Sequence, residues 1–252
     1  GLFYPQQVDT LRHDIEGYLA DYQTRLTPPK AIIVPHAGYI YSGRTAAAAY
    51  KRLENRRSVI DRVVVLGPAH RVGFSGIAAP SVDGFNTPLG DIPLDRLRVE
   101  ELQDEFKEVL IDDRPHRQEH SLEVQLPFLQ VLLDEFELVP LVVGHSSGSA
   151  VADVLRHLWG QESTLVVVSS DLSHFHDYAF ACQRDDATTR AILNLQGDLI
   201  GPEDACGYMP VRGLLRIARE KHLQVELTDQ CNSGDTAGSR DRVVGYGAYG
   251  FN

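Results

Sequence analysis

The chain has 252 residues, of which 43% are apolar and 23% are charged, and this length and composition suit one large α/β domain. Its 24 basic and 35 acidic residues give a net charge of −11, which argues against binding to nucleic acids or to anionic membrane surfaces. Because no run of about 18 apolar residues is present, we expect no membrane-spanning helix. The opening residues lack a secretion signal and the three cysteines are too scattered for a disulfide framework, so we expect a cytoplasmic protein.

Short β-branched runs alternate with stretches of helical spacing along the chain. In chain order, the pattern predicts a helix over 8–25, a strand over 31–34, a helix over 42–53, a strand over 62–66, helices over 94–106 and 122–134, a strand over 138–143, a helix over 150–159, a strand over 165–168, helices over 178–195 and 211–221, and strands over 224–228 and 242–249. Near-continuous apolar runs are typical of strands that are covered on both faces. We therefore predict a single α/β domain over 1–252, with a central mixed, largely parallel sheet flanked by helices.

Three of the predicted strands end in segments that carry a histidine. His36 and His70 follow the first two strands, and His174 follows the strand over 165–168. Ligands of α/β sheets bind beyond the carboxyl ends of the strands, so we expect these imidazoles to converge on one pocket. Asp171 precedes His174 by three residues, where it either orients that imidazole or simply caps the turn.

Cys206 is a further candidate because it comes just before the predicted helix over 211–221. A helix N-terminus lowers the pKa of a thiol, which favours metal binding or nucleophilic attack. The alternative is a buried cysteine that acts as a small hydrophobic side chain, and we expect this role for Cys182 and Cys231. The other histidines are expected at the surface or as caps; they are His13, His116, His145, His157, His176 and His222.

Several longer motifs occur in order from one end of the chain to the other. They are GLFYP (1–5), PHAGYIYSG (35–43), LGPAH (66–70), EHSLEVQLPFL (119–129), SSDLSH (169–174), CGYMP (206–210), NSGD (232–235) and RVVGYGAYGF (242–251). In these motifs the chain resembles the Memo family. The resemblance implies a fold similar to that of the class III extradiol dioxygenases, which are nonhaem iron enzymes with an α/β core.

The resemblance also implies a set of site residues. His36, His70 and Cys206 match the metal-binding positions of the family, with Cys206 in the place of a carboxylate ligand of the dioxygenases. His174 matches the acid/base histidine of those enzymes, and Asp171 matches its neighbour in the pocket. Four more residues of the matching motifs are expected to line the pocket: Tyr39, His120, Glu123 and Asn232. His120 and Glu123 are three residues apart at a predicted helix start, where Glu123 is either a partner of the metal ligands or a solvated side chain.

The resemblance further implies an iron or copper ion as cofactor. A thiolate is softer than a carboxylate and favours copper, zinc or a more covalent iron site, so zinc stays open as an alternative. The expected partners are an unknown small-molecule substrate and, as the family implies, AMMECR1-type and radical-SAM proteins.

Three functions are compatible with these residues. The first is a metal-dependent redox enzyme similar to the dioxygenases. The second is a non-catalytic module that binds a peptide or phosphopeptide in the same cleft, with help from Arg44, although the net charge of −11 disfavours phosphopeptides. The third is a hydrolase that uses Cys206 as nucleophile and a nearby histidine as base. The substrate and the native metal do not follow from the sequence.

Overall fold

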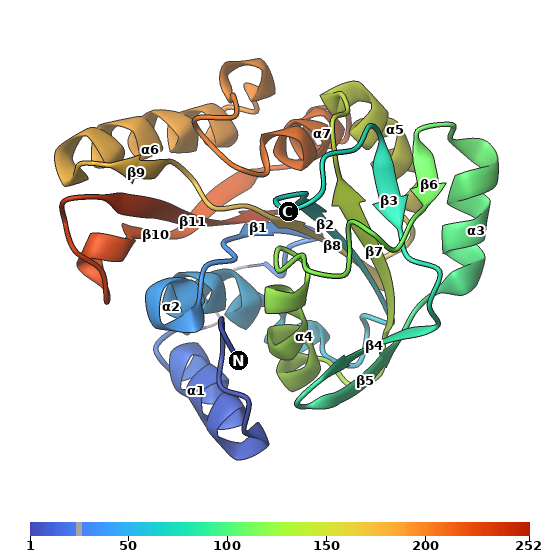
Figure 1. The fold of residues 1–252 in the computed structure, drawn as a ribbon, viewed down its shortest axis with the longest axis horizontal. Helices are drawn as coiled ribbons and strands as arrows, with labels where there is room; N and C mark the ends of the chain where they lie inside the picture. The colour runs from blue at the N-terminus through green and yellow to red at the C-terminus, as the bar shows by residue number, and fades with distance from the viewer. Residues whose placement is uncertain (24–26) are drawn as a thin grey trace.

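One mixed β-sheet organises the molecule (Figure 1). The computed structural model describes residues 1–23 and 27–252. Within them, the strands pair in the order β10-β11-β1-β8-β2-β7-β3-β6, and β9 pairs with β11. A separate hairpin joins β4 to β5. The strands are β1 (Ala31–Val34), β2 (Arg62–Pro68), β3 (Ile77–Ala79), β4 (Gly84–Thr87), β5 (Gly90–Pro93), β6 (Val109–Ile111), β7 (Glu137–Val143), β8 (Thr164–Ser169), β9 (His174–His176), β10 (Val225–Asn232) and β11 (Val243–Phe251).

The middle of the sheet is parallel and its flanks are antiparallel. β1, β8, β2 and β7 run in the same direction, whereas β11 is antiparallel to β1 and β3 is antiparallel to β7. The carboxyl ends of the four central strands therefore lie at one edge, which is where open α/β sheets bind their ligands. This confirms the predicted fold class of an α/β protein with a mixed sheet flanked by helices.

Helices cover both faces of this sheet. They are α1 (Val8–Ala20), α2 (Tyr39–Tyr50), α3 (Arg96–Glu105), α4 (Leu126–Leu132), α5 (Gly148–Leu158), α6 (Tyr178–Leu193) and α7 (Tyr208–Glu220). Side chains alternate along β2, so Val63 and Val65 pack in the core with α1, α2 and α4, whereas Val64 and Leu66 pack in the core with α5 and α7. Burial of both faces explains why the central strands are apolar at nearly every position.

The central strands of the sheet were predictable, and the differences occur in short strands and at the ends of helices. The helix expected over 122–134 begins at Leu126 after a 3-10 turn (Glu123–Gln125), because Pro127 is compatible only with the first turn of a helix. The helix expected over 8–25 ends at Ala20; the last two residues of that prediction, Thr24 and Arg25, lie outside the described residues. The short strands β3, β4, β5, β6 and β9 were not predicted. No helix in the described parts of the chain is long and apolar enough to cross a membrane.

Candidate metal centre

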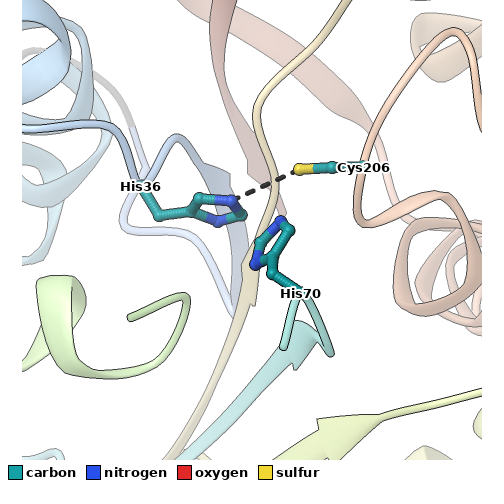
Figure 2. Close-up of side chains that lie close together, drawn as sticks. All are labelled: His36, His70 and Cys206. Carbon is teal, nitrogen blue, oxygen red and sulfur yellow. Dashed lines mark hydrogen bonds between the residues drawn. The ribbon is translucent and has the colours of Figure 1, made fainter. Parts of the chain in front are cut away.

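Three segments distant in the sequence bring His36, His70 and Cys206 together. His36 lies two residues beyond the end of β1, and His70 lies two residues beyond the end of β2. These two strands are separated in the sheet by β8. Cys206 immediately precedes Gly207, the N-cap of α7. One nitrogen of each imidazole and the Sγ of Cys206 all lie within 4.8 Å of one another. Figure 2 shows Cys206 approaching His36 from the opposite side of the site, with one ring nitrogen of His70 turned toward the gap between them.

The His36 ring is held in one tautomer by a buried hydrogen-bond network. Its side chain is 1% exposed, and its Nδ1 lies 2.9 Å from the Oγ of Ser169. That hydroxyl donates its only hydrogen to the carbonyl of Ser121 and accepts a hydrogen from Nε2 of Gln125. Nε2 of Gln125 also donates to the carbonyl of Pro35, which fixes the orientation of the amide. His36 therefore donates from Nδ1, so its Nε2 lone pair faces Cys206 Sγ at 3.3 Å.

The charge state of His36 follows from its burial. Burial lowers the pKa of His36 well below its ordinary value, and the neighbouring His70 and His120 lower it further. A neutral imidazole is the form that binds a metal ion. At neutral pH His36 is therefore in the neutral form that a metal ion can bind.

Glu119 orients the His70 ring through Nδ1, as Ser169 orients the His36 ring. Its Oε1 lies 2.8 Å from Nδ1 of His70, and its Oε2 accepts a 2.6 Å hydrogen bond from the backbone nitrogen of the same residue. Burial alone would raise the pKa of Glu119, but hydrogen bonds from the His70 side chain and backbone and from the backbone of Ser121 lower it to about 2. A carboxylate that binds Nδ1 leaves Nε2 of the imidazole available, an arrangement common among metal-binding histidines.

The sequence analysis did not assign Glu119 any role and considered Glu123 instead. In the structure, Glu123 accepts a 2.7 Å hydrogen bond from the hydroxyl of Tyr4. Glu119 lies 49 residues from His70 in the chain, so only the folded loops bring the pair together. Its place inside the EHSLEVQLPFL motif was the one available signal.

His120 adds a third imidazole beside the two candidate ligands. Its ring centroid lies 5.4 Å from that of His36 and 4.8 Å from that of His70, and its other face stacks on Phe3 at 4.3 Å. Burial lowers the pKa of His120, and the charge of His70 lowers it further. Its Nδ1 is buried and has no hydrogen-bond partner among the described residues. His120 precedes the 3-10 turn, so it does not share a helix face with Glu123.

The Cys206 side chain is partly buried, and its sulfur is held by the backbone at the end of β8. The backbone nitrogen of Asp171 donates to its Sγ at 3.3 Å, and its own backbone nitrogen donates to the carbonyl of Asp171. Burial raises the pKa of the Cys206 thiol far above its ordinary value, and the carboxylate of Asp171 raises it further. The expectation of a lowered thiol pKa was therefore wrong, because desolvation outweighs the helix N-terminus.

Asp171 and His174 lie beside this group, but Asp171 does not hold the His174 ring. Oδ1 of Asp171 accepts a 2.7 Å hydrogen bond from the backbone nitrogen of His36. Burial raises the pKa of the Asp171 carboxyl, although the nearby His174 acts to lower it. Nδ1 of His174 donates instead to the carbonyl of Leu172 at 2.9 Å. The tautomer of His174 is thereby fixed, and its Nε2 is left as a proton acceptor.

Tyr39 and Asn232 have structural contacts of their own. The Tyr39 ring is buried against Phe128, and its hydroxyl donates to the carbonyl of Val124 at 2.8 Å. The Asn232 side chain caps the 3-10 turn Ser233–Asp235 by accepting from the backbone of Gly234.

Two sizeable cavities lie at opposite ends of the central strands. The larger, of about 750 Å³, is lined by the first residues of β2 and β7 and by acidic side chains such as Asp61 and Asp134, away from the histidines. The second, of about 560 Å³, has Cys206 in its wall, together with residues that follow β2 and β7. Of these two cavities, the second adjoins the candidate metal centre through Cys206.

Comparison with known proteins identifies the family. The family model described as "Memo-like protein" matches residues 1–249. The chain belongs to the Memo family. It is 34% identical over 263 residues to a MEMO1 family protein of Methanosarcina barkeri, covering 98% of this chain and 96% of that relative. It is 35% identical over 260 residues to a MEMO1 family protein of Aquifex aeolicus, covering 98% and 94%. The resemblance seen in the sequence motifs is thus confirmed.

A solved structure has the same fold at low sequence identity. It is that of the uncharacterized protein JW3007 from Escherichia coli K12, with a TM-score of 0.54 and 14% identity. The match covers 86% of this Memo-family chain and 98% of the other chain. At this identity the likeness concerns the fold alone.

Proposed function

We propose that this Memo-family protein is a metal-dependent redox enzyme that holds iron or copper on His36, His70 and Cys206 and acts on a small-molecule substrate. The observation that carries the proposal is the convergence of two histidines whose Nδ1 atoms are both engaged, by Ser169 and by Glu119. Their remaining nitrogens and the Cys206 sulfur form a group within 4.8 Å. Two imidazoles and one thiolate fit iron, copper or zinc by ligand type.

The metal would supply redox chemistry, and the chain supplies proton transfer. His174 offers an unprotonated Nε2, because the carbonyl of Leu172 binds its Nδ1. In its protonated form the ring would act electrostatically on both His36 and Asp171, so His174 lies close to the candidate metal ligands. We assign His174 to proton acceptance from the substrate, with Leu172 as the residue that positions the ring. The partly buried site limits the access of water.

The hydrolase alternative is disfavoured by the charge states of its two partners. Cys206 Sγ lies 3.3 Å from Nε2 of His36, which is the spacing of a cysteine–histidine pair. Such a pair acts as thiolate and imidazolium. Burial instead favours the neutral thiol and the neutral imidazole, since it raises the pKa of Cys206 and lowers that of His36.

The phosphopeptide alternative loses one of its expected contacts. Arg44, which the sequence analysis considered as an anchor for phosphate, lies with its Nε 3.2 Å from Oδ2 of Asp21. Both side chains are largely exposed, and neither contacts the histidine group among the interactions of the described residues. The site histidines therefore lack this cationic neighbour.

The proposal is tested by elemental analysis and X-ray absorption of protein purified without oxygen. We expect about one equivalent of iron or copper with sulfur among its ligands, and oxygen uptake that requires the metal. His174→Ala should retain the metal and lose the oxygen uptake, whereas His13→Ala, on the exposed face of α1, should retain both. A protein that takes up no iron or copper after anaerobic reconstitution would contradict the proposal.

Replacing Glu119 by glutamine is expected to weaken metal binding about 10- to 100-fold, the usual effect of removing the partner of a metal-binding histidine. A glutamine has a single acceptor oxygen, whereas Glu119 accepts from Nδ1 and the backbone nitrogen of His70 and from the backbone of Ser121. Metal titration measures the effect. The matched control is Glu123→Gln. The carboxylate of Glu123 binds the hydroxyl of Tyr4, so this substitution should change the metal affinity little.

Gly207→Ala is expected to weaken metal binding without altering a ligand. A Cβ at Gly207 would lie 2.8 Å from the backbone oxygen of Ser169 and 2.7 Å from Cβ of Ser170, so the start of α7 must move away from the end of β8. We expect a loss of about 1–3 kcal/mol in the free energy of unfolding, measured by urea denaturation. Gly201→Ala is the control, because its nearest contact, 3.4 Å to Asp204, is ordinary. Equal metal affinity in the two variants would show that the position of α7 does not matter to the site.

A further inference from the structure

Asp185 is a buried acidic residue to which the mechanism above assigns no role. It lies on α6 and is 2% exposed, and no basic side chain of the described residues forms an ion pair with it. Burying a carboxylate without a counter-charge is costly, and burial raises the pKa of Asp185. Its Oδ1 accepts a 3.0 Å hydrogen bond from the backbone nitrogen of Ser173. The carboxyl therefore lies against the loop that leads into His174.

One peptide group, between Leu172 and Ser173, joins Asp185 to His174. The N–H of this group belongs to Ser173 and donates to Asp185, whereas its carbonyl belongs to Leu172 and accepts from Nδ1 of His174 at 2.9 Å. The peptide is trans, so its N–H and C=O lie in one plane and point in opposite directions. An acceptor that fixes the N–H therefore also fixes the direction of the carbonyl. The same hydrogen bond polarises the peptide and strengthens its carbonyl as an acceptor.

Gly245 of β11 holds the two adjoining peptide groups. Its carbonyl accepts from the backbone nitrogen of Leu172 at 2.8 Å, and its nitrogen donates to the carbonyl of Ser173 at 2.8 Å. A Cβ at Gly245 would collide with the Asp185 carboxyl, lying 2.5 Å from its Cγ. Only a glycine at this position lets the carboxyl reach Ser173 while β11 binds the same loop.

The backbone directly after His174 is strained. Phe175 has a φ of +62°, in the left-handed region that large side chains rarely adopt. The pairing of His174 with Val244 and the hydrogen bonds of Leu172 and Ser173 hold the chain on both sides of the imidazole. Such strain persists where the surroundings fix the backbone, and it is concentrated at functional sites.

We propose that Asp185 is the positioning residue of His174 and acts through the peptide group between Leu172 and Ser173. This role rests on the proposed function, in which His174 accepts a proton at Nε2. By orienting and polarising the peptide, Asp185 keeps the proton of the neutral ring on Nδ1. Without Asp185 the peptide can rotate, and the ring can adopt the tautomer with a proton on Nε2, which cannot accept another from a substrate.

NMR of protein labelled with ¹⁵N-histidine reads the tautomer directly, because protonated and unprotonated ring nitrogens have well-separated shifts. The full chain is measured without metal and with one equivalent of zinc, which is diamagnetic. At about pH 8.5, imidazoles of ordinary pKa, about 6.5, are neutral. The signals of His174 are those that disappear in His174→Ala. We expect the parent protein to carry the proton of this ring on Nδ1, and a proton on Nε2 would overturn the proposal.

Asp185→Ala removes the acceptor of the Ser173 N–H. We expect the ratio of the Nδ1-protonated to the Nε2-protonated form of His174 to fall about tenfold, as the loss of one hydrogen bond implies. Asp185→Asn keeps an acceptor oxygen and should retain the parent ratio. The control is Asp186→Ala on the same helix, since the carboxylate of Asp186 accepts instead from Nε2 of Gln230. An unchanged ratio in Asp185→Ala, or an equal fall in Asp185→Asn, would overturn the proposal.

Gly245→Ala reaches the same carboxyl without replacing it. The added Cβ pushes the Asp185 carboxyl away from Ser173, so the ratio should fall as it does in Asp185→Ala. Thermal unfolding shows whether each variant is folded. A folded Gly245→Ala protein with the parent ratio would contradict the role of this carboxyl.

Oxygen uptake connects the tautomer to the reaction. With iron or copper bound at the parent level, Asp185→Ala should take up oxygen about 10- to 100-fold more slowly, the usual effect of a misplaced reacting group. Full uptake by Asp185→Ala with an altered tautomer would overturn the role of Asp185 in the reaction. A parent protein that shows the Nδ1 tautomer but takes up no oxygen would remove the proposed function alone, so the two failures are distinguishable.

Discussion

His70→Ala is expected to lower the affinity for iron or copper by more than about a hundredfold, since losing even the partner of a metal-binding histidine commonly costs 10- to 100-fold. The fold should change little. The His70 side chain is 27% exposed, and Glu119 keeps its hydrogen bonds from the backbone of His120 and Ser121. Competition with a chelator of known affinity measures the metal, and thermal unfolding measures the fold. A His70→Ala protein that binds metal as tightly as the parent would refute the ligand assignment.

His36→Ala should behave differently, and the contrast is informative. Both histidines follow strand ends, but His36 is buried and its ring binds Ser169. Its removal leaves a cavity in the buried interior and takes one of three hydrogen bonds from the Ser169 hydroxyl, so we expect a loss of about 1–3 kcal/mol in stability besides the loss of metal affinity. His70→Ala is therefore the cleaner test of metal binding.

Metal binding at Cys206 is expected to release about one proton at neutral pH, because metal ions bind the thiolate and burial keeps the free thiol protonated. Below the raised pKa of the thiol, each metal ion bound displaces one proton, so the apparent affinity should rise about tenfold for each unit of increasing pH. His36 adds no proton to this count near pH 7, since its pKa is lowered and the imidazole is already neutral.

Isothermal titration calorimetry in buffers with different ionisation enthalpies counts the released protons. Cys206→Asp is the comparison, because an aspartate has an ordinary pKa of about 3.9 and should release fewer protons at pH 7. Its pH profile should be correspondingly flatter between pH 7 and pH 9. Identical proton release by the parent and by Cys206→Asp would mean that the Cys206 thiolate is not a ligand.

The fold was largely predictable because the central strands are buried on both faces and therefore apolar throughout. The exception was a set of strands of three or four residues, which are too short to give a clear pattern. One of them, β4 (Gly84–Thr87), also has a mixed composition and pairs through a hairpin with β5. The start of α4 also differed from the prediction. Pro127 lies in the first turn of α4, so the preceding residues form a separate 3-10 turn.

The candidate site was predictable in its residue types but not in its supporting contacts. His36, His70 and Cys206 stood out because strand ends and a helix start mark them in the sequence. The partner of His70 could not be predicted, since Glu119 and Glu123 are equally acidic and only the loop geometry selects between them. The raised pKa of Cys206 also required the structure, because it arises from burial by segments that are distant in the sequence.

The order of the strands determines when, during synthesis, the residues of the proposed metal centre come together. β8 lies between β1 and β2, so the segments carrying His36 and His70 reach their final spacing only after residues 164–169 have been inserted between them. Cys206 is translated later still. A chain emerging from the ribosome would therefore carry the two histidines with no fixed spacing and no thiolate beside them, and it would hold a metal ion weakly. Under the proposed function, selective loading would become possible only once α7 has docked, which would protect the unfinished chain from capturing the wrong ion.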